Sequence, residues 1–181
     1  GKDRSGDIEK LRKYNSKKAF ELIVPKLETH NGVKISSSRI RNLLNQGDIV
    51  GARECLGRDY MLSGTVVSGE KLGRKLGYPT ANIRLEYDYP LDGVYLTRTV
   101  IEEKNYVGLA SLGNKPTFNG SEKILEVFIL DFDEDIYSQN IEVYFLEEIR
   151  KQIKFSNEDE LIKQMNEDHK YAIINSKKYG I

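Results

Sequence analysis

Between residues 60 and 146 the chain repeats one pattern, in which hydrophobic residues alternate with small or polar ones over short stretches. Alternation is typical of β-strands, because successive side chains of a strand point to opposite faces. Gly, Pro, Asn and Asp residues separate the stretches and indicate turns, as in an antiparallel barrel or sandwich. The stretches that we expect to form strands are 60–68, 81–85, 93–100, 106–112, 124–132 and 141–146.

A helix is predicted after these strands, from about residue 157 to 174, with Ser156 as its cap. Its apolar stripe carries Leu161, Met165 and Ala172. The chain is therefore predicted to be mainly β, with a C-terminal helix.

The segment before the strands has a mixed pattern, which predicts a small α/β fragment. Asp7 is expected to cap a short helix, and the apolar run 20–24 to form a buried strand. The serines at 36–38 offer caps to a helix that ends at Gly47, and Asp48 is expected to cap the next helix.

The overall composition excludes several classes of protein. Lys plus Arg and Asp plus Glu number 28 each in 181 residues, so the basic surplus of a non-specific nucleic-acid or anionic-membrane binder is missing. The single cysteine, Cys55, excludes an intrachain disulfide and fits a reducing compartment. The sequence shows no apolar run long enough to span a bilayer and no signal-peptide pattern. We expect a cytoplasmic protein that acts on small molecules, without nucleic-acid or membrane partners.

A glycine-rich, cationic stretch follows the first predicted strand. Gly69, Gly73 and Gly77 are spaced four residues apart, and Lys71, Arg74 and Lys75 lie between them. Glycine allows a backbone to approach a ligand closely, and basic side chains with open N–H groups suit a polyphosphate. A β-turn without a ligand is the alternative, because glycine commonly marks turns.

Thr80 and Asn82 follow this stretch within Pro-Thr-Ala-Asn. In a strand their side chains point to the same face, so a hydroxyl and an amide oxygen converge there. Such oxygens could complete the coordination of a hard cation that also binds phosphate.

The run from Gly69 to Asn82, Gly-x-x-x-Gly-Arg-x-Leu-Gly-Tyr-Pro-Thr-Ala-Asn, resembles the signature of riboflavin kinases. In bacteria this domain usually forms the C-terminal half of a bifunctional riboflavin kinase/FMN adenylyltransferase (FAD synthetase). The resemblance implies a six-stranded antiparallel Greek-key barrel that converts riboflavin and ATP to FMN and ADP. It also implies Mg²⁺ bound at Thr80 and Asn82. The nucleotide would contact Gly69, Lys71, Gly73, Arg74, Lys75, Gly77, Thr80 and Asn82.

Glu126 is the one charged residue in the apolar stretch 124–130. A carboxylate among such neighbours is costly unless it is paired or used. The residues alone allow an edge position, a partner arginine or a general base. The resemblance favours the base, since a glutamate in the matching strand of riboflavin kinases takes the proton of the ribityl hydroxyl. Relatives often have His two positions later, where this chain has Phe128.

Five further residues are flavin contacts by resemblance: Asn114, Pro116, Thr117, Arg150 and Phe155. The first three belong to the run 113–118, which is otherwise typical of a turn but resembles a loop that folds over flavin and nucleotide. Arg150 and Phe155 suit a planar ring, because guanidinium and aromatic faces stack on such rings. Without the resemblance, a solvated charge and a residue packed on the helix explain them equally well.

The run 35–41, Ile-Ser-Ser-Ser-Arg-Ile-Arg, resembles the motif that handles ATP phosphates in the family's adenylyltransferase domain. We therefore expect residues 1–56 to be the C-terminal fragment of a nucleotidyltransferase-like α/β domain and residues 57–181 to be the riboflavin kinase domain. No His-x-Gly-His motif is present, so this fragment is not expected to transfer AMP.

Two other classes of function stay open from the sequence. One is a barrel that binds flavin or nucleotide without turnover, and the other is a protein-interaction barrel whose glycine loop is structural. FMN formation from riboflavin, ATP and Mg²⁺ distinguishes the three.

Overall fold

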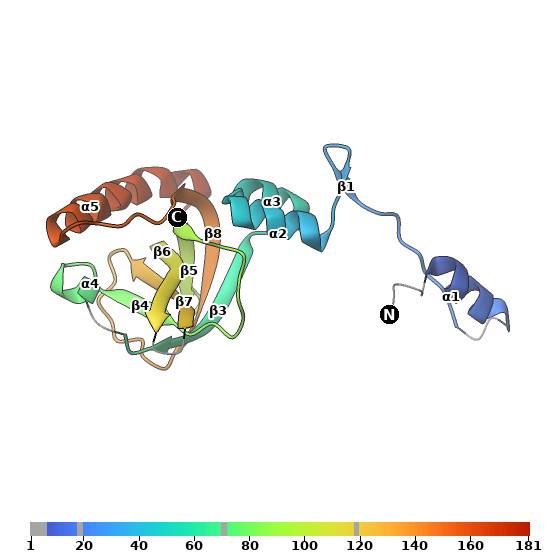
Figure 1. Ribbon diagram of the computed structural model, residues 1–181, viewed down its shortest axis with the longest axis horizontal. Coiled ribbons are helices and arrows are strands. Elements are labelled where there is room, and N and C mark those ends of the chain that lie inside the picture. The colour runs from blue at the N-terminus through green and yellow to red at the C-terminus, as the bar shows by residue number, and fades with distance from the viewer. Residues whose placement is uncertain (1–6, 18–19, 70–71, 118–119) are drawn as a thin grey trace. The chain divides into compact units, whose positions relative to one another are not determined.

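The computed structural model describes residues 7–17, 20–69, 72–117 and 120–181 (Figure 1). The chain forms two compact units, residues 1–35 and 36–181.

The larger unit is built on a closed antiparallel barrel with the strand order β3-β4-β7-β6-β5-β8. Its strands are β3 (Tyr60–Val67), β4 (Thr80–Ile83), β5 (Gly93–Ile101), β6 (Lys104–Thr117), β7 (Gly120–Ile129) and β8 (Asn140–Arg150). β5, β6 and β7 are consecutive neighbours, and β8 returns to pair with β5, which is a Greek key. β8 also pairs with β3, so the sheet closes. The predicted six-stranded barrel is confirmed.

The alternation seen in the sequence separates two apolar layers. Inward side chains fill the barrel, and they include Tyr95, Val127 and Phe145, each with no exposed surface. Side chains of the opposite parity, such as Leu96 and Leu109, form a second cluster outside the sheet that includes Ala172 of the C-terminal helix. The barrel therefore has a packed interior and one covered outer face.

Helix α5 (Glu158–Asn175) covers that outer face and is followed by the 3₁₀ helix η3 (Ser176–Tyr179) (Figure 1). Its cap is Asn157, whose side chain accepts a hydrogen bond from the Glu160 N–H, so the prediction of Ser156 as the cap is wrong. The Ser156 N–H instead donates to the Glu160 side chain. The cap therefore lies one residue later than predicted. Within the described ranges, no helix is long and apolar enough to cross a membrane.

A helical hairpin precedes the barrel in the same unit. It consists of α2 (Ser37–Gln46) and α3 (Ile49–Leu56), capped by Ser36 and Asp48 as predicted. Gly47 ends α2 with a φ of 80°, a left-handed conformation that favours glycine. Since α3 contacts both β3 and β8, the hairpin packs on the barrel. The predicted domain boundary between residues 56 and 57 stays a prediction.

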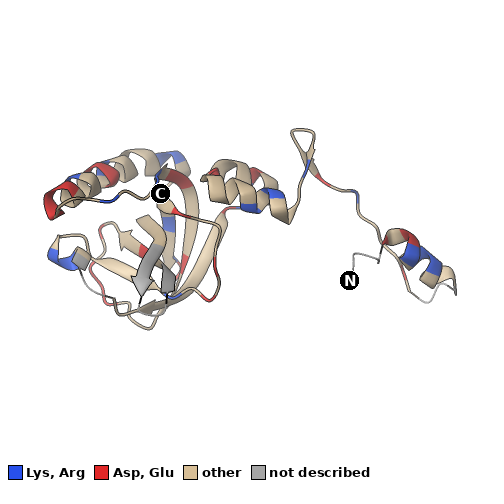
Figure 2. Cartoon of the chain, in the orientation of Figure 1, with Lys and Arg blue, Asp and Glu red and all other residues tan. Residues whose placement is uncertain are grey.

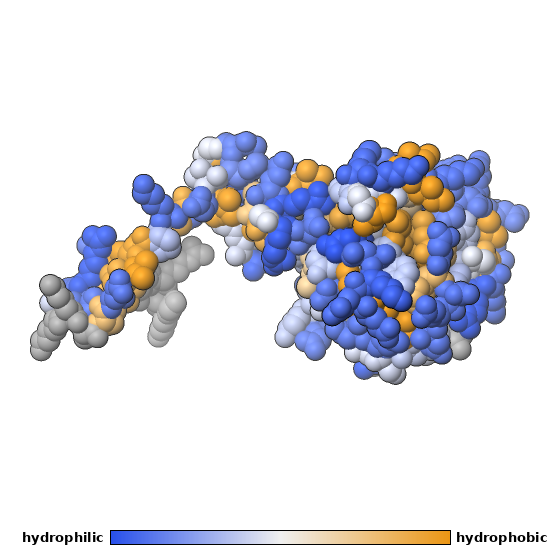
Figure 3. All heavy atoms as spheres, turned by 180° about the vertical axis from the view of Figure 1, so that it is seen from behind, coloured by the Kyte–Doolittle hydropathy of each residue, from blue (hydrophilic) through white to orange (hydrophobic). Residues whose placement is uncertain are grey.

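The smaller unit contains α1 (Ile8–Tyr14), η2 (Asn15–Lys17) and a hairpin of β1 (Thr29–His30) and β2 (Val33–Lys34). Asp7 caps α1 as predicted. The prediction of a buried strand at Phe20–Val24 is wrong: this segment is irregular, and Ile23 is 74% exposed. A strand needs a neighbour for its backbone groups, and none among the described strands pairs with this run. Figure 3 shows apolar atoms gathered on the surface of this unit.

The β6–β7 hairpin is longer than predicted. Gly113–Thr117 continue β6 and pair with Gly120–Ile124 of β7, so the turn expected at 113–118 is strand up to Thr117. The cross-strand pairing of polar residues extends the hairpin beyond the alternating apolar positions, which were the signal used to bound the strands.

The turn between β5 and β6 yields a stability prediction. Ile101 pairs with Lys104, and both turn residues have positive φ, 46° for Glu102 and 67° for Glu103. Two-residue turns of this kind favour Asn and Gly. A left-handed backbone costs a non-glycine residue roughly 1–2 kcal/mol, and the unfolded freedom of glycine offsets roughly 0.5–1 kcal/mol. Glu103→Gly should therefore raise the free energy of unfolding by about 0.5–1 kcal/mol in urea denaturation.

The matched control is Glu134→Gly, at an exposed position without positive φ. It should lower the free energy of unfolding, because glycine there adds only unfolded-state freedom. Equal effects of the two substitutions would contradict the strain assigned to Glu103.

Candidate active site

A single cross-strand row brings the predicted catalytic residue beside a predicted metal ligand. Glu126 on β7 is directly opposite Asn82 on β4 and Ser111 on β6. The row continues through Val94 on β5 to Arg150 on β8. Directly opposed residues of antiparallel strands have Cβ atoms about 4.5–5.5 Å apart. The barrel register thus fixes the spacing of these side chains.

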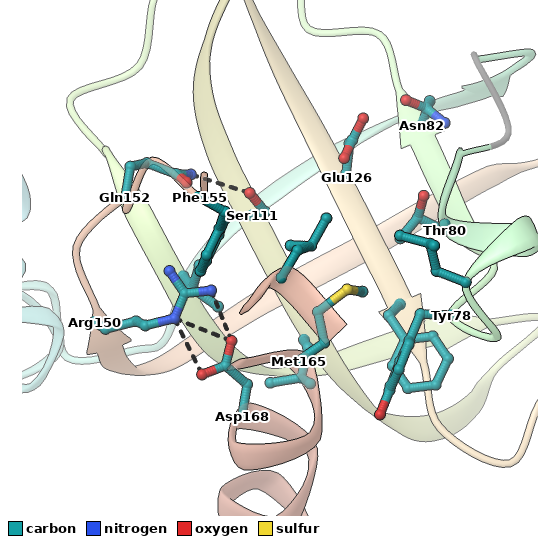
Figure 4. Close-up of a pocket in the computed structure, with 16 residues that line it drawn as sticks. Tyr78, Thr80, Asn82, Ser111, Glu126, Arg150, Gln152, Phe155, Met165 and Asp168 are labelled. Carbon is teal, nitrogen blue, oxygen red and sulfur yellow. Dashed lines mark hydrogen bonds and ion pairs between the residues drawn. The ribbon is translucent and has the colours of Figure 1, made fainter. Parts of the chain in front are cut away.

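This row forms the floor of a cavity of about 290 Å³ on the outer face of the barrel. Figure 4 shows Glu126 between Ser111 on one side and Asn82 on the other, with Thr80 close by. The remaining walls are largely apolar and come from β6, β7, the segment after β8 and α5. They include Leu109, Phe128, Phe155, Leu161 and Met165.

Thr80 and Asn82 both line this cavity, which confirms the shared face expected from their spacing. Asn82 is 9% exposed. Gly69 lies so close to it that an added Cβ would overlap the Asn82 amide. A Cβ on Gly73 would likewise overlap the Tyr78 carbonyl oxygen and come within 3.5 Å of the Thr80 hydroxyl. Gly73 is therefore needed where it approaches the Tyr78 backbone, whereas a side chain at position 69 would have to displace the Asn82 amide.

The structure describes two of the three basic residues of the loop. Arg74 and Lys75 are exposed on the short helix α4 (Leu72–Lys75), which appears blue in Figure 2. Lys71 lies outside the described residues. Gly77 has a φ of 84° and open space around it, so it serves the turn rather than a close approach.

A second cavity, of about 330 Å³, lies across Thr80 from the first. Apolar side chains, such as those of Val127, Ile129 and Phe132, line it together with Arg74 and the acidic run Asp133–Asp135. Thr80 lines both cavities. Two cavities, of which the second adds charged side chains to an apolar lining, thus share the Thr80 side chain.

The position of Glu126 in the sheet excludes one of the three explanations that the sequence left open for it. The carboxylate is half-buried, and β7 pairs on both sides within the closed barrel, so an edge position is wrong. Its role as a base stays a prediction.

Arg150 is held by an ion pair rather than solvated. Its Nε and Nη2 atoms donate to the Asp168 carboxylate at 2.8–3.1 Å, and the Arg150 and Asp168 side chains are 16% and 6% exposed. The Gln164 amide donates to the same carboxylate at 3.0 Å. The Arg150 guanidinium lies 5.9 Å from the Phe155 ring centroid. Arg150 and Phe155, both predicted flavin contacts, therefore border the cavity. The Arg150–Asp168 ion pair fastens α5 to the end of β8.

Gln152 closes the cavity beyond Arg150. Its amide donates to the Ser111 hydroxyl at 3.0 Å, the Leu112 carbonyl at 3.2 Å and the Gly93 carbonyl at 3.3 Å. These bonds tie the segment after β8 across β5 and β6. Asn114, Pro116 and Thr117 belong to the adjoining end of β6, and their flavin contacts stay predictions.

Tyr78 connects the glycine loop with α5. Its hydroxyl donates to the Asn166 side chain at 2.7 Å. Its ring centroid lies 5.1 Å from that of Phe128 and 6.1 Å from that of His169, both in edge-to-face geometry. Burial and, secondarily, the charge of Asp168 raise the pKa of the Tyr78 hydroxyl, so it stays a donor at neutral pH.

Sequence reasoning missed Tyr78, Ser111, Gln152 and Asp168 as parts of the site. Asp168 carried a usable signal. It falls on the stripe of Leu161, Met165 and Ala172 at helical spacing, so it is a charged residue on a buried face, as Glu126 is on its strand. Ser111 and Gln152 become visible only through the strand register and the path of the chain after β8.

A largely apolar cavity with a few convergent polar groups is typical of a protein that binds a small organic molecule. The riboflavin kinase family model, named flavokinase, matches residues 56–174. The chain therefore belongs to the riboflavin kinase family.

Individual relatives agree with this family. A bifunctional riboflavin kinase/FMN adenylyltransferase from Buchnera aphidicola (subsp. Schizaphis graminum) is 39% identical over 173 residues, covering 93% of this chain and 55% of that protein. Its counterpart from Listeria monocytogenes is 36% identical over 171 residues, covering 93% and 54%. The crystal structure of a macrolide-efflux protein from Streptococcus pneumoniae has a TM-score of 0.78 and 38% identity, covering 91% and 54%. The chain thus spans about half the length of the curated relatives that it matches.

The ion pair at the cavity wall predicts a large stability effect. Asp168→Ala leaves the Arg150 guanidinium largely buried without its carboxylate, which should lower the free energy of unfolding by about 3–5 kcal/mol. The control is Lys151→Ala, which breaks the neighbouring pair with Glu148, where the lysine side chain is 56% exposed, and should cost under about 1 kcal/mol. Chemical denaturation measures both. Losses of the same small size would show that Arg150 does not depend on Asp168.

Proposed function

We propose that the barrel unit transfers the γ-phosphoryl group of ATP to the 5′-hydroxyl of riboflavin, giving FMN and ADP. The observation that carries this proposal is the meeting of two cavities at Thr80, with Glu126 and Asn82 opposite each other beside it. A phosphoryl acceptor and a phosphoryl donor need such adjoining sites, because this reaction depends mainly on positioning and on charge neutralisation.

The apolar cavity suits the acceptor. Its long apolar walls, contributed by Leu109, Phe128, Leu161 and Met165, fit a flat aromatic ring system. Glu126 and Ser111 lie together on its floor, where a hydroxylated side chain of the acceptor could reach them. Arg150 and Phe155 would border the isoalloxazine ring.

The glycine loop suits the donor, together with Arg74 at the second cavity. Arg74 lines this cavity, and Gly69 and Gly73 bring the loop backbone against Asn82 and Thr80. Cationic side chains and open N–H groups stabilise phosphate oxygens. The loop would thus hold the triphosphate next to β4, as the family signature implies.

Mg²⁺ fits the donor set at Thr80 and Asn82. Hydroxyl and amide oxygens are hard ligands, and Mg²⁺ in phosphoryl-transfer sites typically takes one or two protein ligands together with phosphate and water oxygens. The described residues offer no cluster of three or more His, Cys, Asp or Glu side chains that would bind a metal without substrate. When bound, the ion would neutralise charge on the phosphates.

Glu126 would act as the general base. The ribityl O–H bond breaks and its proton passes to the carboxylate, while the oxygen forms a bond to the γ-phosphorus and the bond to ADP breaks.

We expect this reaction in the cytoplasm, which is consistent with the single reduced cysteine. Incubation of the chain with riboflavin, ATP and Mg²⁺, followed by chromatographic detection of FMN, tests the proposal. FMN-free mixtures with bound flavin would favour a binding module instead.

Glu126→Gln separates catalysis from binding. The amide keeps the volume and one acceptor but cannot take a proton, so turnover should fall by roughly 10²–10⁴-fold. Riboflavin affinity, measured by fluorescence quenching, should change little. Full turnover per folded molecule with a lower melting temperature would identify Glu126 as a structural residue.

Thr80→Ala and Asn82→Ala test the metal assignment. Each removes one oxygen ligand, so the Mg²⁺ concentration for half-maximal turnover should rise, with maximal turnover reduced by roughly 10-fold or more. Ser68→Ala, just before the loop, is the control and should leave both values unchanged. Normal Mg²⁺ dependence in both ligand variants would refute the assignment.

A further inference from the structure

Helix α5 and the glycine loop are joined by one side chain that the proposed reaction leaves without a role. Tyr78 follows the loop directly, and its hydroxyl donates to the Asn166 side chain of α5 at 2.7 Å. The Asn166 amide in turn donates to the Ile162 carbonyl at 2.9 Å, which fixes its orientation. The bond therefore joins two groups that are already held in place.

The backbone of Tyr78 holds the loop. Its N–H donates to the Gly73 carbonyl at 2.8 Å, and its own carbonyl oxygen lies where a Cβ on Gly73 would be. Pro79 fixes φ directly after it, which restricts the backbone between Tyr78 and Thr80. A displacement of the Tyr78 backbone would therefore be passed to α4 and to Thr80.

The other end of this connection is the acceptor cavity. Leu161, Met165 and Asp168 of α5 form one wall of it, on the same helix as Asn166 and His169. Phe128, on the cavity wall, packs edge-to-face against the rings of both Tyr78 and His169. A ligand in the cavity would thus contact both α5 and the Phe128 ring, which lie against Tyr78.

We propose that Tyr78 is a positioning residue that couples the acceptor cavity to the phosphate-binding loop through its bond to Asn166. The proposal rests on the proposed function, since it takes riboflavin as the occupant of the apolar cavity. Riboflavin that packs against α5 then favours the loop position that binds the triphosphate. By linkage, ATP favours riboflavin binding by the same factor.

The test measures this factor directly. The dissociation constant of AMP-PNP with Mg²⁺ is determined by calorimetry without and with saturating riboflavin. The value without riboflavin divided by the value with riboflavin is the coupling factor. The wild-type ratio should exceed 1 clearly. Tyr78→Phe and Asn166→Ala should each reduce the ratio by about 2- to 10-fold, the range of one neutral hydrogen bond. The double variant should lose no more than either single one, because both remove the same bond.

Two features of the design separate coupling from loss of structure. Asn166 does not line the cavity, so Asn166→Ala should leave riboflavin affinity without nucleotide within about 2-fold. The matched control is Tyr171→Phe, which removes another α5 tyrosine hydroxyl, bonded to Glu147 on β8 at 3.0 Å and remote from the loop. In this control, the ratio of the AMP-PNP dissociation constants without and with riboflavin should equal that of the wild type.

Each other outcome is decisive. A wild-type ratio of 1 in a chain that forms FMN, or an unchanged ratio in Tyr78→Phe and Asn166→Ala, overturns the coupling while the proposed function stands. An equal loss in Tyr171→Phe assigns the effect to general anchoring of α5 and overturns the role of Tyr78. A wild-type chain that neither binds riboflavin nor forms FMN refutes the proposed function, and the coupling with it.

Discussion

The closure of the sheet by β8 is the constraint on which the site depends. Because β8 pairs with both β3 and β5, every strand of the barrel has two neighbours, and a one-residue slip of any of them would turn its core side chains outward. That register places Asn82, Glu126 and Ser111 in one row. Since the same strands bury Val127 and Leu125 inside, the stability of the barrel and the geometry of the row have the same cause.

Helix α5 converts this exposed row into a cavity. A strand row by itself would face water, and its carboxylate would be an ordinary surface group. The helix packs on the outer apolar layer through Ala172 and is fastened by the Arg150–Asp168 ion pair. Breaking such a pair is costly because it leaves a buried charge, so the helix is held in one position over the row. The price is a carboxylate on the apolar face of α5.

The sequence predicted the parts of this arrangement that local periodicity specifies. The six strands, the caps at Ser36 and Asp48, and the common face of Thr80 and Asn82 follow from patterns of two or four residues. The apolar run at Phe20–Val24 misled, because hydrophobicity reveals the need for a partner and not its presence. The contacts of Tyr78 with Asn166 and of Gln152 with Ser111 join residues 88 and 41 positions apart, and no local pattern predicts them.

The chemical step is proposed for the strands and nucleotide binding for the loop, and this difference has a physical reason. Proton transfer requires the base within about 3 Å of the acceptor hydroxyl, and small displacements at such a site cost large factors in rate. Paired strands therefore suit the roles proposed for Glu126 and Asn82, because backbone hydrogen bonds set the spacing of the two residues. The triphosphate binding proposed for the loop instead needs backbone that can approach a ligand closely, which glycines such as Gly69 and Gly73 allow. Loss of the loop should thus impair nucleotide binding first, whereas loss of the strand pairing should impair the chemical step itself.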